Sequence, residues 1–568
     1  MSRQSLWIRL IATAVVSCTL FACSSNEPPP ESYQNGLVVS AHELASSVGV
    51  EILKQGGNAV DAVVATSYAL AVVHPTAGNI GGGGFMLIRT PDGMSTGIDY
   101  REQAPAGAHP DMFLDDNGNF IQELTRSGAL AAGVPGTVAG TLFALEKYGT
   151  KSRMEVLGPA VELAREGWIL DRPMGGEEFM QFPSTNRVFN HADGTTHESG
   201  ERWVQSDLAR TLTDIANQGK DGFYKGEIAD LIVATMNAHG GIVSHQDLED
   251  YEVRERVPVH GTYRGYGVVS MPPVSSGGTT LIQLLNILER YDLRSAGHNE
   301  TGALHLLAEA MRRSFADRNW YIADPDFIDV PSDILINKVY ADSRAADINP
   351  DRATPSTAVA HGDVTLAISE SDETTHFSVV DQDGMAVAVT TTINSAYGSK
   401  LVVEGAGFLL NNQMGDFSAK PGVPNHSGHV YGEANGIAPG KRMISSQTPT
   451  IVTKDGKNFL VLGAAGSGRI ITAVLQTIVN AIDYDMSIAD AVNAPRIHHQ
   501  WFPDQIEYEE ELGGGITPAT LSGLEALGHS LTPRMHGKVH ALMIDPETGS
   551  ITGIADPRRD PAGAAVGY

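Results

Sequence analysis

Two adjacent threonines, Thr374 and Thr375, stand where a polar stretch of the chain gives way to a run of β-forming residues. A threonine hydroxyl is a weak nucleophile unless a base lies beside it, and the α-amine of an N-terminal threonine is such a base. That amine titrates at about pH 8, so it can accept the hydroxyl proton under ordinary conditions. Cleavage of the bond between Glu373 and Thr374 would create it. Composition alone favours a plainer interpretation, in which both threonines are strand residues.

The stretch before this pair, 341–373, is rich in Asp, Ser, Thr and Ala and has little apolar periodicity. Structureless segments of this length inside compact proteins are usually functional or disordered. A mobile segment that ends at a scissile bond would explain the composition. We therefore expect 341–373 to form a loop.

Four other motifs are interpreted as structural. The glycine run 81–84 precedes a strand-like segment and lacks the Lys of a phosphate-binding loop, so close backbone packing is expected there. The pair at 498–499, two histidines, has no partner at metal-ligand spacing. The segment 381–384 lacks the later acidic residues of a calcium loop and is expected to be a turn. Ser445-Ser446 does not lie in a Gly-x-Ser-x-Gly elbow. We expect no metal and no cofactor.

The composition excludes several classes of protein. The 568 residues include 39 Lys and Arg against 67 Asp and Glu, for a formal charge of −28, and 42% are hydrophobic. That hydrophobicity excludes a disordered chain, and the length allows roughly two to four domains or one large α/β unit. The acidic excess argues against nucleic acid as a partner, because a phosphate backbone needs a positive surface. Both cysteines, Cys18 and Cys23, lie near the start, which excludes a disulfide framework and a cysteine nucleophile in the body.

The first 22 residues have the features of a signal peptide. Two arginines flank the start of an apolar run, 10–22, which is shorter than the about 20 residues of a membrane-spanning helix. Leu20-Phe21-Ala22-Cys23 resembles a bacterial lipobox, in which Cys23 becomes the lipidated first residue. The alternative is an ordinary secretory signal. Residues 23–35 would form a Pro-stiffened tether, and resemblance to bacterial lipoproteins with Ser after the Cys suggests a periplasmic body anchored to the outer membrane.

Helix signals open the body of the protein and recur in its middle. Leu44, Val48 and Ile52 recur at four-residue spacing, and Gly56-Gly57 would end that helix. Asn58 can cap a second helix, 59–73, whose almost wholly apolar sequence predicts burial. Apolar periodicity also predicts helices over 281–288 and 304–315.

Hairpin signals are equally frequent. Turn residues lie between β-rich runs at Asp92-Gly93, Asp383-Gly384, Asp455-Gly456 and Glu547-Thr548-Gly549. Antiparallel hairpins with interspersed helices predict a layered α/β architecture with a mixed or antiparallel sheet.

Several longer motifs extend these observations over the chain: GGNAVDAVVA, HPTAGNIGGGGFM, DYREQAPA, GVPGTVAG, MPPVSSGG, TTHFSVVDQDGMAVAVTTTIN, NNQMGDFSAKPGVPN and SSQTPTIV. In these motifs the chain, from about Gly36 to Tyr568, resembles the γ-glutamyltransferase (γ-glutamyltranspeptidase) family of N-terminal nucleophile hydrolases. The resemblance implies a precursor that cuts itself between Glu373 and Thr374. Its large fragment, 36–373 after the tether, and its small fragment, 374–568, would form a heterodimer. The implied fold is a four-layer αββα sandwich built from both fragments.

The resemblance also implies a catalytic role for each matching position. Thr374 would be the nucleophile and, through its amine, the base. Thr392 would hold that amine with its hydroxyl. Backbone N–H groups at Gly466 and Ser467 would stabilise the oxyanion.

A second set of positions matches the family's substrate receptor. The α-carboxylate would be held by Arg101, with help from Ser445 and Ser446, because a guanidinium fork suits two oxygens. The α-ammonium would be held by Asn394, Gln413 and Asp416. The two sites together imply γ-glutamyl donors such as glutathione. Transfer of the γ-glutamyl group to water would make the protein a hydrolase, and transfer to an amino acid or dipeptide would make it a transferase.

Three positions depart from the family pattern. Ser467 stands where glycine is common, and a positive φ would strain it. Gly415 stands where an acidic residue often precedes the receptor aspartate. Ser427 stands where bacterial members with a lid often have Tyr, and Tyr431 follows four residues later.

Two other functions remain as alternatives. A glutaryl or cephalosporin acylase of the same fold would not need an α-ammonium site, so Arg101 and Asp416 oppose it. An inactive solute-binding lipoprotein would need neither Thr374 nor a scissile bond.

Overall fold

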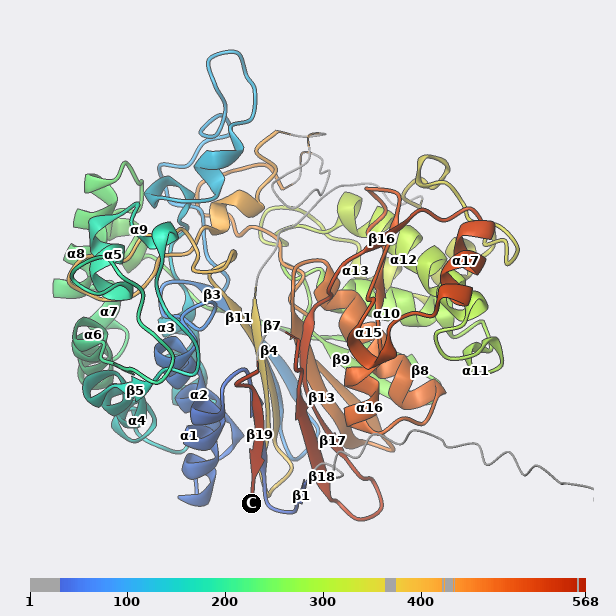
Figure 1. Ribbon diagram of the computed structural model, residues 1–568, viewed down its shortest axis with the longest axis horizontal. Coiled ribbons are helices and arrows are strands. Elements are labelled where there is room, and N and C mark those ends of the chain that lie inside the picture. The colour runs from blue at the N-terminus through green and yellow to red at the C-terminus, as the bar shows by residue number, and fades with distance from the viewer. Residues whose placement is uncertain (1–30, 363–373, 421–422, 424–432, 434, 559–560) are drawn as a thin grey trace, which may run out of the picture.

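Two seven-stranded antiparallel sheets face each other and carry helices on both outer sides (Figure 1). The computed structural model describes residues 31–362, 374–420, 423, 433, 435–558 and 561–568. The arrangement is the four-layer αββα sandwich that the sequence predicts. Strands from both predicted fragments pair within each sheet, so the fold requires both.

Each large sheet is named here after one of its strands, β10 or β13. The β10 sheet has the order β19 (Ala564–Gly567), β2 (Leu37–Ser40), β10 (Thr375–Val380), β11 (Ala386–Thr392), β3 (Gly83–Arg89), β4 (Ser95–Asp99) and β7 (Arg254–Arg256). The β13 sheet has the order β1 (Ser32–Tyr33), β18 (Ile551–Ala555), β17 (Lys538–Ile544), β13 (Lys457–Ala465), β12 (Thr450–Lys454), β9 (Tyr266–Ser270) and β8 (Val259–Tyr263). Two small sheets comprise β14 (Ile497–His498), β15 (Ile506–Tyr508) and β16 (Leu531–Pro533), and β5 (Trp168–Ile169) with β6 (Arg202–Trp203).

The helices divide between the two outer layers (Figure 1). On the side of the β10 sheet lie α1 (Glu43–Lys54), α2 (Ala59–Val73), α3 (Thr137–Tyr148), α4 (Arg153–Glu166), α5 (Pro183–Phe189), α6 (Ser206–Gln218), α7 (Asp221–Tyr224), α8 (Gly226–Ala238) and α9 (His245–Glu249). On the side of the β13 sheet lie α10 (Gly277–Leu288), α11 (Leu293–Ala296), α12 (Thr301–Tyr321), α13 (Ser332–Leu335), α14 (Lys338–Ala345), α15 (Arg469–Asp483), α16 (Ile488–Asn493) and α17 (Pro518–Ala526). Short 3-10 turns include η4 (Ser356–Ala358) and η5 (Gln413–Asp416).

Strand alternation assigns each side chain of the central strands to a layer. In β10, Phe377 and Val379 pack into the core beneath α1–α8, whereas Val380 joins the core between the sheets. In β11, Ala386 and Ala388 face the same inter-sheet core as Val380. Even-numbered residues of both strands therefore face the β13 sheet.

Local sequence signals predict the elements well. The side chain of Asn58 accepts hydrogen bonds from Val60 N and Asp61 N and caps α2, all of whose residues are buried. The four predicted turns connect β3 to β4, β10 to β11, β12 to β13 and β17 to β18. The predicted helices over 281–288 and 304–315 lie within α10 and α12.

The loop predicted over 341–373 is partly observed: the described residues 346–355 and 359–362 lie in no helix or strand, whereas two short stretches are helical. Helix α14 extends to Ala345, and residues 356–358 form η4. Polar side chains elsewhere in the protein bind the backbone of this segment, so its order does not depend on apolar periodicity. The predicted signal peptide, Cys23, Glu373, Ser427 and Tyr431 lie outside the described residues. Within the described ranges, no helix is long and apolar enough to cross a membrane.

Candidate active site

Thr374 and Thr392 come together at one end of the β10 sheet. Strands β10 and β11 pair antiparallel, and the last paired positions at this end are Thr375 and Thr391. One residue further, Thr374 precedes β10 and Thr392 ends β11, both with at most 4% of their surface exposed. Continuing the alternation, both threonines are on the face that looks toward the β13 sheet. The structure thus brings together the predicted nucleophile and the hydroxyl predicted to hold its amine.

The glycine run 81–84, at the start of β3, lets its backbone approach that of the end of β11 closely. A Cβ on Gly82 would lie 2.0 Å from the carbonyl oxygen of Thr392, and one on Gly84 would lie 2.4 Å from that of Thr390. Only glycine permits so close an approach of two backbones. The run is structural, as predicted, and it fixes the path of the chain at Thr392.

His376 is the histidine nearest to Thr374 in sequence, yet its surroundings are unsuited to a general base. Its Nδ1 lies 2.8 Å from Thr390 Oγ1 and its Nε2 lies 2.9 Å from Ser378 Oγ, so both ring nitrogens are engaged. Burial lowers the pKa of His376 well below its usual range. The ring therefore stays neutral between the sheets. The α-amine that cleavage would release at Thr374 remains the better candidate for the base.

The predicted oxyanion donors, Gly466 and Ser467, lie at the Thr374 end of β10. Asn458, near the start of β13, donates to Gly384 O in the β10–β11 turn at 2.9 Å. Further along β13, a Cβ on Gly463 would contact the His376 ring. Strand β13 thus runs opposite to β10 and ends near Thr374. The chain then leads into α15, whose N-terminal N–H groups favour negative charge.

Ser467 has the strained backbone that its sequence predicts. Its φ is +65°, in the left-handed region that residues other than Gly, Asn and Asp rarely adopt. Its side chain is buried, and its Oγ has no hydrogen-bond partner among the described residues. The residue therefore combines two unfavourable features. Strain of this kind persists mainly at functional sites, where the surrounding structure enforces it.

Arg101 and Asp416 form a buried ion pair. Arg101 follows β4, and Asp416 ends η5; Arg101 Nη2 lies 2.5 Å from Asp416 Oδ2. The guanidinium also donates to two backbone carbonyls, Met443 O at 3.2 Å and Ile444 O at 2.9 Å. These contacts fix the orientation of the fork. The predicted carboxylate and ammonium sites are therefore parts of one cluster.

Two amide side chains hold Asp416 and connect it to the threonines. Asn394 Nδ2 donates to Asp416 Oδ1 at 2.8 Å, and Gln413 Nε2 donates to Asp416 Oδ2 at 2.7 Å. The backbone N–H of Asn394 donates to Thr392 Oγ1 at 2.7 Å. Asn394 adopts a φ of +76°, which asparagine tolerates better than most residues. Asn394 thus connects Thr392, which is predicted to hold the amine of the nucleophile, to the predicted α-ammonium site at Asp416.

Glu102 is a buried carboxylate beside this cluster that sequence reasoning did not single out. Its Oε2 lies 3.5 Å from Arg101 Nη1, and neither carboxylate oxygen has a hydrogen-bond partner among the described residues. Burial raises the pKa of Glu102 to about 7, although the Arg101 charge opposes the shift. Its charge therefore changes near neutral pH next to the predicted substrate receptor.

Ser445 and Ser446 lie in the segment that passes Arg101, but their described hydrogen bonds go elsewhere. Ser445 Oγ accepts from Gln447 N at 3.2 Å. Ser446 Oγ accepts from Arg318 Nη2 at 2.9 Å, and Arg318 Nε donates to Ser276 Oγ at the same distance. The structure thus adds the fully buried Arg318 of α12 to the site region. The sequence does not distinguish Arg318, because α12 also carries the charged residues Glu309, Arg312, Arg313 and Asp317.

Asn435 is a further residue that the sequence did not reveal. Its Nδ2 donates to Asp416 O at 2.7 Å, and its Oδ1 accepts from Ile444 N at 3.3 Å. It therefore connects η5 to the segment 443–444, whose backbone carbonyls accept hydrogen bonds from Arg101. Asparagine is common in loops, so its type alone gives no signal of this role.

The buried residues His305, Glu309 and His529 are of the types that bind metals, but the ring nitrogens and carboxylate oxygens described below are already engaged in hydrogen bonds. His305 Nδ1 lies 2.8 Å from His529 Nε2, so these two nitrogens face each other. The nearby Glu309 accepts from Arg313 Nη1 at 2.6 Å and from Thr354 N at 3.0 Å. We interpret the group as a structural hydrogen-bond network. A partly exposed group comprises His191, His197 and Glu201.

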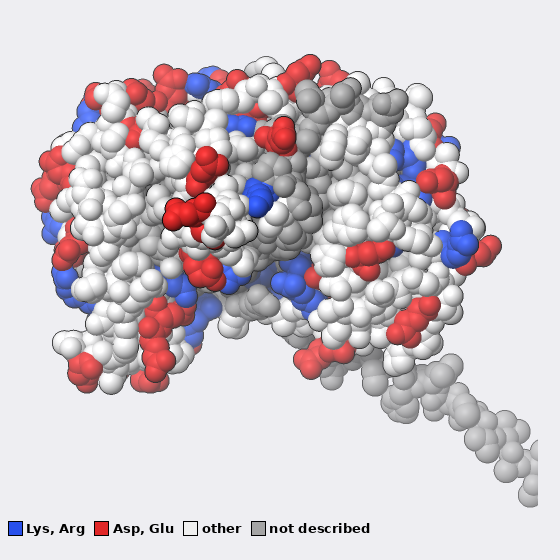
Figure 2. Space-filling view, turned by 90° about the horizontal axis from the view of Figure 1, so that it is seen from above, with Lys and Arg blue, Asp and Glu red and all other residues white. Residues whose placement is uncertain are grey.

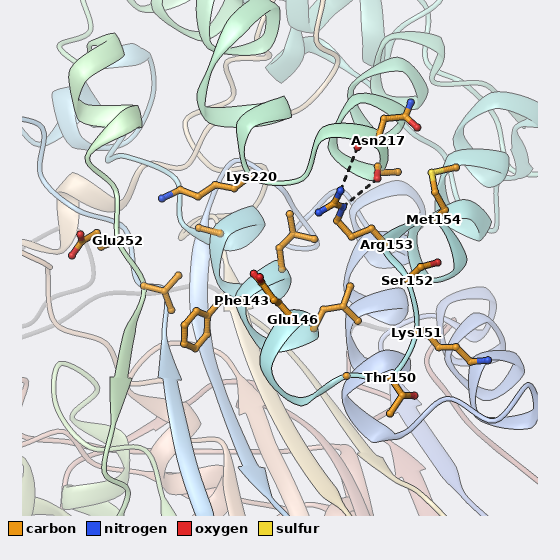
Figure 3. A pocket seen from close by; sticks show the side chains of 16 residues that line it. Phe143, Glu146, Thr150, Lys151, Ser152, Arg153, Met154, Asn217, Lys220 and Glu252 are labelled. Atoms are coloured by element: carbon orange, nitrogen blue, oxygen red, sulfur yellow. Dashed lines mark hydrogen bonds between the residues drawn. The ribbon is translucent and has the colours of Figure 1, made fainter.

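A cavity of about 800 Å³ lies away from these residues, between α3, α4 and α6 (Figure 3). Two of its cations are engaged: Arg153 donates to the carbonyls of Ala216 and Asn217, and Lys220 donates to Tyr251 O. None of the predicted site residues lines it. The predicted site residues lie instead at one end of the central strands. Figure 2 shows the acidic and basic side chains interspersed over one face of the molecule.

The comparisons with known proteins agree with this geometry. A family model described as gamma-glutamyltranspeptidase matches residues 45–566. The chain belongs to the gamma-glutamyltranspeptidase family. The chain is 47% identical over 570 residues to a glutathione hydrolase proenzyme of Escherichia coli (strain K12), with 97% of each chain covered.

Solved structures extend the family likeness to the fold. A cephalosporin acylase from Bacillus halodurans matches with a TM-score of 0.82 at 26% identity, covering 98% of this chain and 99% of that one. A chain of Helicobacter pylori gamma-glutamyltranspeptidase matches with a TM-score of 0.58 at 44% identity, covering 59% of this chain and 99% of its own length. The chain is thus similar in fold to the cephalosporin acylase, and it is more similar in sequence to the transpeptidase chain.

Proposed function

We propose that the protein is a self-processing γ-glutamyltransferase and glutathione hydrolase. The observation that carries this is the buried Arg101–Asp416 pair at the same end of the β10 sheet as Thr374. A fixed cation and a fixed anion complement the two charges of an α-amino acid. The name of the Escherichia coli relative, glutathione hydrolase proenzyme, supports both the substrate and the processing.

Self-cleavage comes first. The Thr374 hydroxyl attacks the Glu373 carbonyl carbon, the peptide C–N bond breaks, and an ester forms while the α-amine of Thr374 is released. Water then opens the ester, which leaves Glu373 with a carboxylate and Thr374 with a free hydroxyl. The cut yields a large fragment ending at Glu373 and a small fragment of residues 374–568. The match of a Helicobacter pylori chain to 59% of this chain supports a division of this kind.

Turnover uses the amine that the cut releases. The α-amine takes the proton of the Thr374 hydroxyl as its oxygen attacks the γ-carbonyl of the donor. The backbone N–H groups of Gly466 and Ser467 stabilise the oxyanion, and Thr392 holds the amine. The amine returns the proton to the leaving nitrogen, and a γ-glutamyl ester remains on Thr374. Water or the amine of an amino acid or dipeptide then takes the γ-glutamyl group.

Substrate selection separates this function from that of an acylase. Arg101, assisted by Ser445 and Ser446, would hold the α-carboxylate, and Asn394, Gln413 and Asp416 would hold the α-ammonium. A glutaryl group lacks only the α-ammonium, so it would forgo the contact with the Asp416 carboxylate. Sites built to bind a polar group reject analogues that lack it by about 10⁴-fold or more.

One comparison tests this assignment. The γ-glutamyl and glutaryl p-nitroanilides share the scissile amide and differ only in the α-ammonium. We expect kcat/KM to favour the γ-glutamyl compound by about 10⁴-fold. Preference for the glutaryl compound would make the protein an acylase, and no turnover of either compound by a cleaved protein would favour a binding role.

We further propose that the protein is a lipoprotein of the bacterial periplasm, anchored through Cys23 to the outer membrane. The lipobox-like Leu20-Phe21-Ala22-Cys23 supports this. Replacement of Cys23 by Ser should move the protein from the membrane fraction to the soluble fraction. An unchanged membrane fraction would refute the anchor.

A further inference from the structure

Two histidines and a glutamate gather on the chain between α5 and β6, apart from the candidate active site. His191 Nε2 lies 3.0 Å from Glu201 Oε2, and His197 Nδ1 lies 3.4 Å from the same oxygen. One ring nitrogen of each histidine and one carboxylate oxygen all lie within 4.8 Å of one another. Three potential metal ligands therefore converge on one small volume.

Backbone hydrogen bonds hold the three residues in place. His191 N donates at 2.8 Å across the turn that follows it. His197 and Met174 exchange two backbone hydrogen bonds of 2.9 Å, and the carbonyl oxygen of Glu201 accepts from Leu170 N at 2.9 Å. The main chain at all three positions is thus already ordered, so an ion that binds there does not have to order it.

The distances suit tetrahedral coordination of one ion. Bonds of about 2.0–2.1 Å to imidazole nitrogen and carboxylate oxygen place two ligand atoms of a tetrahedron about 3.3 Å apart. The two distances to Glu201 Oε2, 3.0 and 3.4 Å, lie on either side of that value. The side chains of His191, His197 and Glu201 are 39%, 15% and 40% exposed. The rings can therefore adjust, and water can take the fourth position.

An ordinary ion pair explains the cluster less well. The two imidazole rings lie with their centroids 4.0 Å apart, so a positive charge on one ring opposes a charge on the other. The pKa of His197 is lowered, first by burial and then by the His191 charge, although Glu201 opposes the shift. A neutral ring adds no charge to balance Glu201, but its nitrogen lone pair can bind a metal ion.

Other histidines near carboxylates differ from this cluster. His245 Nε2 lies 2.8 Å from Asp230 Oδ1, and in the described part of the chain no third ligand joins this exposed pair. The buried group that contains His305 has its ring nitrogens and carboxylate engaged in the hydrogen bonds given above. The cluster at His191 thus combines three convergent ligands with access from solvent.

We propose that His191, His197 and Glu201 bind one divalent transition-metal ion such as Zn²⁺, at an accessory site separate from the candidate active site. Imidazole nitrogens favour such ions over calcium and magnesium, which prefer oxygen ligands. An ion held by all three residues would tie the turn to the chain that pairs with Met174, so it would stabilise the folded protein. No step of the proposed γ-glutamyl chemistry uses this ion, so the proposal is independent of the proposed function.

The test is a zinc titration of the purified protein, prepared without a polyhistidine tag and stripped of metal with a chelator. Isothermal titration calorimetry measures the affinity and the stoichiometry, and thermal unfolding with and without zinc measures the stabilisation. His191→Gln and Glu201→Gln each remove one ligand. The matched control is His245→Gln, which removes an exposed histidine that contacts a carboxylate outside the site. Thermal unfolding without metal shows whether each variant is folded.

We expect the wild type and His245→Gln each to bind one zinc ion and to melt at a higher temperature with zinc than without it. His191→Gln and Glu201→Gln should bind zinc at least about tenfold more weakly, because even the hydrogen-bond partners of metal ligands contribute about 10–100-fold to affinity. Calcium and magnesium should not compete. Equal zinc affinity in all four proteins, equal weakening by His245→Gln, or no binding to the wild type at millimolar zinc would overturn the site.

Discussion

Arg101 and Asp416 lie in direct contact, Nη2 to Oδ2 at 2.5 Å, although 315 residues separate them in the chain. Each side chain is at most 2% exposed. Buried ion pairs contribute little net stability, because hydrophobic residues of similar volume often serve as well or better. A binding role explains the pair more readily than a structural one.

Replacement of Asp416 by Asn should impair the binding of γ-glutamyl donors. The change removes the negative charge that would pair with the α-ammonium, and truncation of one partner of a buried charge pair weakens binding by about 2–5 kcal/mol. We expect kcat/KM for a γ-glutamyl anilide to fall at least about 30-fold. The control is Glu404→Gln, because Glu404 forms an ion pair with Arg187 in which both side chains are at least 60% exposed. Equal activity of the two variants would contradict the receptor role.

Replacement of Thr392 by Val should disturb both halves of the site. The hydroxyl accepts the Asn394 backbone N–H, and a buried donor left without a partner costs about 1–3 kcal/mol. Because Asn394 also holds Asp416, we expect lower kcat and higher KM for the γ-glutamyl anilide. Thr392→Ser keeps the hydroxyl and should restore most activity. If Ser and Val variants behave alike, the hydroxyl has no such role.

Replacement of Ser467 by Gly should stabilise the protein and leave its activity close to wild type. Relief of the left-handed backbone gains about 1–2 kcal/mol, and removal of the unpartnered hydroxyl gains about 1–3 kcal/mol. The greater flexibility of Gly in the unfolded chain offsets about 0.5–1 kcal/mol, so a net gain remains. Thermal unfolding and anilide turnover check the prediction. A large loss of turnover would show that the hydroxyl, and not only the backbone N–H, takes part in the reaction.

Replacement of Glu102 by Gln should remove a pH dependence of stability. The folded-state pKa is raised to about 7, above that of the unfolded chain. Between about pH 4.5 and 7 the unfolded chain has lost the proton that the folded protein retains, so stability falls as pH rises through this window. The full difference above pH 7 is about 3 kcal/mol. We expect the melting temperature of the variant, relative to wild type, to rise from pH 5 to pH 8; parallel curves would contradict the shifted pKa.

The sequence predicted those parts of the fold that depend on local chemistry. The Asp-Gly turns and the Asn58 cap set the ends of their elements through their own hydrogen bonds and backbone preferences, so they could be recognised in isolation. Of the residues in the longer motifs, Arg101, Asp416, Asn394 and Thr392 are connected by hydrogen bonds in one buried cluster. At Ser467 the sequence indicated only that a positive φ would strain the residue, and the structure shows that φ is positive.

The parts that the sequence could not predict depend on contacts between distant residues. Residues 341–373 were expected to form a loop, yet two short stretches are helical, and Trp501 and Asp504, about 145 residues after Ser356, bind its backbone. Arg318 is placed near the site by its hydrogen bond to Ser446, which lies 128 residues later in the chain. Asn435 is placed there by its hydrogen bond to the backbone of Asp416. Their residue types occur in ordinary surfaces and loops, so only the folded arrangement distinguishes them.

The most direct test of a threonine nucleophile released by self-cleavage is the intact mass and N-terminal sequence of the purified protein and of its Thr374→Ala variant. The wild type should yield two fragments, and the smaller should begin Thr-Thr-His-Phe at Thr374, whereas the variant should remain one chain without activity. An active wild type that remains one chain, or a cut that occurs equally in Thr374→Ala, would contradict the mechanism.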